Sequence, residues 1–130
     1  MRLLLIFLFL TSAANAETLL HCKFKWGDKV SPGERTTYTE GEIKDIYLKI
    51  DFEKEKVIES PFGIYGTFGI SKTNILFTTS EVRWWGENQY VSLFANLNRQ
   101  NGELRSVYNR KDVRESSEEN YICSRGKLKF

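Results

Sequence analysis

The amino-acid sequence predicts an all-β protein: an antiparallel meander of about eight strands that closes into a small barrel or folds over as a sandwich. Apolar and polar residues alternate with a period of two along most of the chain, which is typical of half-buried strands. Short polar turns separate these segments, and no segment carries a long helical period. We expect the sheet to close because both architectures protect exposed strand edges.

The first segment, residues 1–16, is predicted to be a signal peptide. Arg2 supplies the positive charge, residues 3–10 are all apolar, and the small residues Ala14 and Ala16 define a cleavage site after Ala16. The apolar run is less than half of the ~20 residues needed to cross a bilayer, so we expect no stable membrane insertion after cleavage. Residues 17–130 then form a single β-domain.

The two cysteines, Cys22 and Cys123, are expected to form a disulfide, as an even number does in an exported chain. A bridge between the two ends places the first and last strands side by side, which favours the barrel. His21 stands where a bacterial lipobox requires a small residue, so a lipid anchor is not expected. We therefore predict a secreted or periplasmic protein.

The first two strands, over residues 18–26 and 45–52, show clear alternation. We expect His21 on the outer face of the first strand and Asp51 on the outer face of the second. The side chains expected inside are Leu20, Cys22, Phe24, Trp26, Ile46, Leu48, Ile50 and Phe52.

The next strand pattern, over residues 62–70, is interrupted by glycine at every third position. Gly63, Gly66 and Gly69 predict bulges or tight bends in a curved sheet, and the alternative is a close backbone approach to a ligand. A further short strand is expected over residues 74–80.

A hairpin follows over residues 81–97, and it contains two adjacent tryptophans. Because neighbouring side chains in a strand point to opposite faces, Trp84 and Trp85 cannot share one core. Val82 and Trp84 are the more apolar pair on their strand, so we expect Trp84 inside and Trp85 outside. The residues expected inside on the second strand are Val91, Leu93, Ala95 and Leu97.

The last third of the chain contains one strong hairpin signal and one polar stretch. Asn101 and Gly102 predict a hairpin with a type I′ turn. Residues 109–119 are predicted to be the longest loop, with space for a short turn of helix. A final strand is expected over residues 120–125.

The predicted binding patch lies on the outer face of the tryptophan hairpin. It consists of Arg83 and Trp85 with Tyr90 and Phe94 across the hairpin, a composition typical of binding hot spots. In the alternative reading, Trp85 only covers the sheet, under the Arg83 guanidinium or the long polar loop. A second alternative is an enclosed cavity lined by inner residues such as Trp84.

Several classes of function are not expected from this composition. Removing the leader takes away one of 19 basic residues and none of the 17 acidic ones, so the net charge falls from +2 to +1. Nucleic-acid-binding domains usually carry a strong basic excess. His21 is the only histidine and no CxxC is present, so we expect no catalytic residue, metal site or cofactor.

Two resemblances add to this interpretation. The stretches "LLHC", "NRQNGEL" and "YIC" resemble the layout of small exported bacterial β-proteins of unknown function with terminal cysteines, which implies a periplasmic all-β domain. "RWWGENQ" is similar to the Trp-Gly hairpin of the periplasmic inhibitors of C-type lysozyme, which are disulfide-closed β-barrels. Their Ser-Gly-x-x-Tyr inhibitory loop has no match here, and the nearest stretch is "SPFGIYG".

The sequence thus predicts an exported, monomeric, non-catalytic β-domain. Its expected partner is an envelope macromolecule or a small ligand, bound through the aromatic patch. The alternatives are an inhibitor of a cell-wall hydrolase and a structural envelope protein.

Overall fold

The computed structural model describes residues 17–60 and 73–125, which form one antiparallel sheet and no helix. The predicted all-β meander is therefore confirmed. No helix in this part of the chain is long and apolar enough to span a bilayer. The predicted leader with its cleavage site at Ala16, and Gly63, Gly66 and Gly69, lie outside the described residues. The strands are β1 (Glu17–Ser31), β2 (Glu34–Thr39), β3 (Ile46–Asp51), β4 (Lys56–Glu59), β5 (Asn74–Phe77), β6 (Glu81–Glu87), β7 (Val91–Asn98), β8 (Glu103–Arg110) and β9 (Glu115–Arg125).

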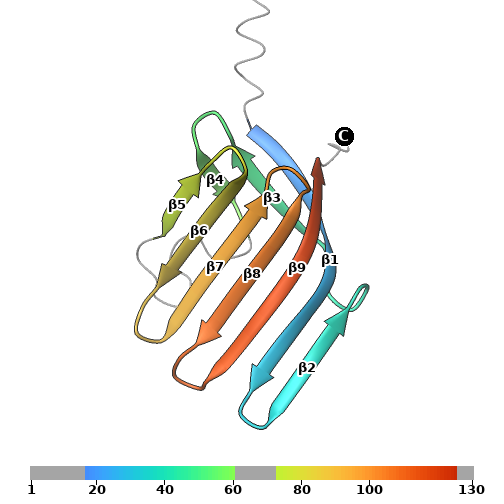
Figure 1. The fold of residues 1–130 in the computed structure, drawn as a ribbon, viewed down its shortest axis with the longest axis vertical. Coiled ribbons are helices and arrows are strands. Elements are labelled where there is room, and N and C mark those ends of the chain that lie inside the picture. Colours follow the sequence, from blue (N-terminus) through green and yellow to red (C-terminus); the bar gives the residue numbers. More distant parts are fainter. Residues whose placement is uncertain (1–16, 61–72, 126–130) are drawn as a thin grey trace, which may run out of the picture.

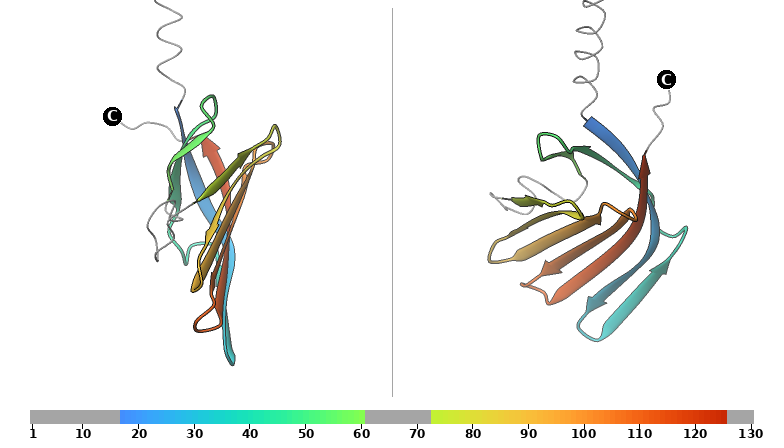
Figure 2. Two further views of the ribbon diagram at one scale, coloured as in Figure 1. Left: turned by 90° about the vertical axis from the view of Figure 1, so that its left-hand side faces the viewer. Right: turned by 45° about the horizontal axis from the view of Figure 1, so that its top comes forward.

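The sheet has the strand order β4-β3-β1-β9-β8-β7-β6-β5, and β2 pairs with the far half of β1. It curls so strongly that its two edge strands, β4 and β5, lie on the same side of the molecule (Figures 1 and 2). The result is a nearly closed barrel. Strand β2 was not predicted, since "ERTTYT" contains a single apolar residue and no clear alternation.

The first and last strands are paired and cross-linked, as predicted. Cys22 lies directly opposite Cys123 in the β1–β9 register, and their sulfur atoms are bonded. The backbone N–H of Cys123 donates to the carbonyl of Gly102 (2.8 Å), on the side away from β1. The two cysteines therefore form a non-hydrogen-bonded pair, the arrangement that brings opposite side chains closest together.

The core fills the inside of the curled sheet and follows the period of two. Trp84, Val82 and Phe24 are buried, and the Phe24 and Tyr121 rings meet edge to face at 5.4 Å. Burial and a hydrogen bond from the hydroxyl to Glu119 (2.6 Å) raise the pKa of Tyr121 above its usual value. The alternate residues of β7 are buried as predicted: Val91, Leu93, Ala95 and Leu97.

Trp26 was expected inside but lies on the outer face, 46% exposed. The pairing of β1 with β9 shifts between Phe24, opposite Tyr121, and Trp26, opposite Asn120. Lys25 is thus an extra residue, a β-bulge, and every side chain after it changes face. The prediction for Trp26 is wrong because it assumed an uninterrupted strand.

Asp51 was expected outside but is only 3% exposed. It is the last residue of β3, where the chain turns toward β4. Its Oδ1 accepts a hydrogen bond from the backbone N–H of Lys54 (2.9 Å), so the carboxylate supports this turn instead of facing solvent.

The long loop predicted over residues 109–119 is also wrong. Strand β8 continues to Arg110 and β9 begins at Glu115, so only residues 111–114 form the turn. The polar residues between Glu115 and Asn120 pair through their backbones at an end of the sheet where their side chains are half-buried. Hydrophobic periodicity does not detect such a strand.

The hairpin predicted at Asn101 and Gly102 is confirmed, but its turn is not of type I′. A type I′ turn needs positive φ at both central residues. Here Gly102 alone has a positive φ, of 78°, and its N–H donates to the carbonyl of Asn98 (2.9 Å). The loop therefore has four residues, 99–102.

Replacing Gly102 with alanine is expected to lower the free energy of unfolding by about 2–4 kcal/mol. An added Cβ would clash with the carbonyl oxygen of Cys123, and alanine is strained at this φ. Gly33→Ala is the matched control, since Gly33 has a φ of 77° with open space around it, and should cost about 1 kcal/mol. Urea denaturation measures both, and equal losses would show that the close approach to Cys123 has no effect.

Candidate functional site

The two tryptophans of β6 point to opposite faces, as predicted. Trp84 is fully buried in the core, whereas Trp85 is 37% exposed on the outer face. Trp85 lies opposite Phe94 of β7, which in turn lies opposite Val107 of β8. We call these three residues the outer row. Phe94 and Val107 are half-buried, so the row presents a partly exposed apolar surface across three strands.

Arg83 lies on the same face, two residues before Trp85. Its Nε donates to Oδ1 of Asn96 (3.2 Å), and its guanidinium pairs with Glu81 (2.7 Å). Within the described chain, the cation–π contact found joins a different pair, Arg99 and Phe52. The guanidinium of Arg83 is therefore held by Asn96 and Glu81, which does not support the alternative in which it covers Trp85.

Tyr90 is separate from the outer row. It lies in the turn between β6 and β7, and its side chain is exposed. Its carbonyl accepts a hydrogen bond from the backbone N–H of Lys111 (2.7 Å). The structure thus brings together three of the four predicted patch residues, Arg83, Trp85 and Phe94, and places Tyr90 at the end of the hairpin.

A line of polar residues runs beside the outer row. Arg83 lies opposite Asn96, Asn96 opposite Arg105, and Arg105 opposite Asn120. We call these four residues the polar row. Trp26 lies opposite Asn120 and ends the line on β1. Sequence reasoning missed Trp26 because the bulge at Lys25 depends on pairing with a distant strand and leaves no local signal.

The polar row borders a groove of about 400 Å³ on the outer face. The positive charge of Arg105 in this groove is balanced by Glu118, which Arg105 contacts through both Nε (2.6 Å) and Nη2 (2.5 Å). Asn120 donates to the other oxygen of Glu118 (3.3 Å). The residues that line the groove are Lys25, Trp26, Asn96, Asn98, Glu103, Leu104, Arg105, Asn120, Tyr121 and Ile122.

His21, also predicted on the outer face, is tied to its neighbours. Its Nε2 lies 2.9 Å from Oδ2 of Asp45, and its ring stacks on Tyr47 at 5.0 Å. Desolvation favours the neutral acid, but hydrogen bonds from His21 and from the backbone of Phe24 lower the pKa of Asp45 below its usual value. In residues 17–60 and 73–125, no three histidine, cysteine, aspartate or glutamate side chains are grouped to hold a metal ion.

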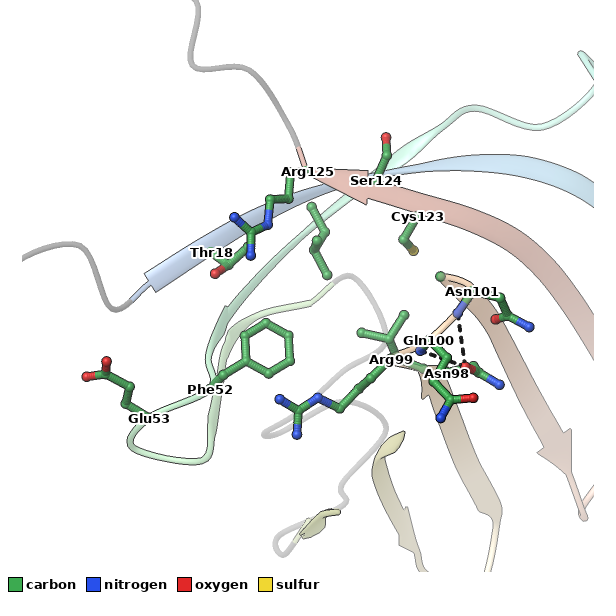
Figure 3. Close-up of a pocket in the computed structure, with 13 residues that line it drawn as sticks. Thr18, Phe52, Glu53, Asn98, Arg99, Gln100, Asn101, Cys123, Ser124 and Arg125 are labelled. Carbon is green, nitrogen blue, oxygen red and sulfur yellow. Dashed lines mark hydrogen bonds between the residues drawn. The ribbon is translucent and has the colours of Figure 1, made fainter. Parts of the chain in front are cut away.

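A larger cavity of about 600 Å³ opens at one end of the barrel, and we call it the mouth pocket (Figure 3). Its walls come from the start of β1, the loop after β3, the turn between β7 and β8, and the end of β9. The alternative prediction was a cavity lined by inner residues such as Trp84. The mouth pocket is not that cavity, because Trp84 is not among its lining residues. The lining residues are Thr18, Leu20, Phe52, Glu53, Leu97, Asn98, Arg99, Gln100, Asn101, Gly102, Cys123, Ser124 and Arg125.

Comparison of the chain with protein-family models, with curated proteins and with solved structures finds no match. The resemblances to small exported bacterial β-proteins and to inhibitors of C-type lysozyme therefore stay predictions. Most of the stretch nearest to the inhibitory loop, residues 61–66, lies outside the described residues.

Proposed function

We propose that this chain is an exported, non-catalytic β-domain that binds a macromolecule of the cell envelope through its outer face. The register that lines up Trp85, Phe94 and Val107 away from the core is the observation that carries this proposal. Tryptophan and arginine are the residues most enriched at binding hot spots. The polar row beside them offers amide and guanidinium donors that orient a partner.

The shape of this face favours a macromolecule over a small ligand. The outer face of a curled sheet is convex, and neither the outer groove nor the mouth pocket includes Trp85 or Phe94. Small-molecule sites are concave and bury most of the ligand surface. A convex aromatic surface instead suits a broad partner surface that covers several strands at once.

Two further parts of the proposal are export and the lack of catalysis, and they rest on the cysteines and on His21. A disulfide between Cys22 and Cys123 is consistent with an oxidising, exported environment. Both thiols are consumed by this bridge, which leaves neither as a nucleophile. The imidazole of His21 contacts the carboxylate of Asp45 and stacks on the ring of Tyr47.

Trp85→Ala is expected to abolish partner binding and to change stability little. Because Trp85 is partly exposed, losing its contact with Phe94 should cost about 1 kcal/mol and lower Tm by a few degrees. A photo-cross-linking side chain placed at Val107 should capture an envelope component in the parent chain. The same probe in the Trp85→Ala background should capture at least about tenfold less, as for loss of a hot spot.

Tyr47→Ala is the matched control, since Tyr47 is an exposed aromatic residue on β3, remote from the outer row in the strand order. This variant should keep the full cross-linking yield. A fall in Tm of more than about 10 °C for Trp85→Ala would instead place Trp85 in the core. Lysozyme activity measured with added purified protein decides whether the partner is a hydrolase of that type.

A further inference from the structure

The mouth pocket has the dimensions of a ligand site and is separate from the outer row. Its volume of about 600 Å³ falls within the range of small-molecule pockets, roughly 300–1,000 Å³. Trp85, Phe94 and Val107 do not contribute to its lining. A ligand bound here therefore contacts residues other than those of the outer row.

The deep side of the pocket is apolar. Leu20 and Leu97 are buried members of the core that also line the pocket. Cys123, whose sulfur is bonded to Cys22, lies beside them in the lining. Phe52 projects between the walls (Figure 3). These side chains form a surface suited to a hydrocarbon group.

Arg99 enters the pocket in a fixed position. Its guanidinium carbon lies 4.9 Å from the centre of the Phe52 ring, and its Nη1 donates to the carbonyl of Thr78 (2.6 Å). The backbone N–H of Arg99 donates to the carbonyl of Ser80 (2.8 Å). A guanidinium has five N–H donors, so a ligand finds the remaining ones already oriented.

Arg125 supplies a second guanidinium, beside Thr18 on the wall across from Arg99 (Figure 3). Neither arginine forms an ion pair with a carboxylate of residues 17–60 and 73–125. Glu53, the acidic residue in the lining, points away from both guanidinium groups (Figure 3). Four other arginines do pair with a carboxylate: Arg35, Arg83, Arg105 and Arg110.

We propose that the mouth pocket binds a small amphiphilic anion. Its carboxylate or phosphate lies between Arg99 and Arg125, and its hydrocarbon part packs on Phe52, Leu20 and Leu97. Two permanently charged arginines beside the apolar part of the cavity match this combination, because guanidinium groups bind both carboxylates and phosphates through paired hydrogen bonds.

Calorimetric titration of the purified, disulfide-bonded protein with decanoate, decyl phosphate and decanol tests the proposal. We expect binding of at least one anion with one molecule per chain, and binding of decanol at least about tenfold weaker, because charge-assisted hydrogen bonds are lost. The two anions distinguish a carboxylate ligand from a phosphate ligand. Decanol that binds as tightly as both anions, or the absence of binding by all three, would overturn the proposal.

Arg99→Gln and Arg125→Gln should each weaken binding of the preferred anion by roughly 10- to 100-fold. Arg125 lies at the end of β9, so its replacement leaves the fold intact even if Arg99→Gln disturbs the β7–β8 turn. Arg105→Gln, on the outer face, and Trp85→Ala should leave anion binding unchanged, which separates this site from the proposed partner surface. Unchanged affinity in Arg125→Gln would contradict the proposal.

Discussion

Replacing both Cys22 and Cys123 with alanine is expected to lower the free energy of unfolding by about 4 kcal/mol. The bridge joins residues separated by 101 positions, so its loss frees nearly the whole described chain in the unfolded state. Chain entropy accounts for this magnitude, since a longer closed loop restricts the unfolded ensemble more. The native sheet should persist, because β1 and β9 remain paired along most of their length.

Urea denaturation of the parent chain, the reduced parent chain and the double variant measures this effect. The two chains without the bridge should agree with each other, and the dependence of the unfolding free energy on urea should become steeper, because their unfolded states expose more surface. A midpoint unchanged by reduction would show that the bridge does not stabilise the fold.

Trp84→Ala is expected to cost about 3–5 kcal/mol, the range for deleting a large, fully buried aromatic side chain. Such a loss comes close to the whole stability of a small domain, so the variant should be largely unfolded at moderate urea. Trp85→Ala, one residue further along β6, should cost about 1 kcal/mol. The contrast arises from strand alternation alone, since the two residues share the same strand and chemistry.

Trp84→Phe provides a milder change at the same position. The indole Nε1 of Trp84 is buried and has no hydrogen-bond partner among the described residues, so phenylalanine removes volume without breaking a hydrogen bond. We expect a loss of about 1–3 kcal/mol, smaller than for alanine. Thermal and urea unfolding of Trp84→Ala, Trp84→Phe and Trp85→Ala measure the relative losses of stability. Similar losses for Trp84→Ala and Trp85→Ala would contradict the assignment of the two tryptophans to opposite faces.

Sequence alternation was sufficient wherever a strand is regular. It placed Trp84, Leu48 and Leu97 inside and Trp85 outside, because side-chain direction in an unbroken strand depends only on counting residues. The pairing of Cys22 with Cys123 followed from their number and predicted the neighbouring terminal strands.

The departures from the prediction have non-local causes. The bulge at Lys25 exists because β1 must pair with β9, and it moves Trp26 to the outer face beside the polar row. Strands β8 and β9 extend through polar residues because backbone pairing suffices there. Neither the bulge nor the extension of these strands can be recognised from the local sequence.

The two candidate sites also differ in whether local sequence could predict them. Arg83, Trp85 and Phe94 lie within one hairpin, so a local pattern found them. The mouth pocket joins Phe52, Arg99 and Arg125 from three distant parts of the chain, and no motif marks them. Only the closure of the sheet brings these side chains around one cavity.

Hydroxyl-radical footprinting of the protein, once purified and once in its native compartment, tests the central claim most directly. We predict that Trp85 and Phe94 are oxidised in the purified protein and protected in the compartment, where the partner covers them, whereas Trp84 stays unmodified in both. Equal oxidation of Trp85 in the two samples, or oxidation of Trp84 in preference to Trp85, would contradict the proposed binding face.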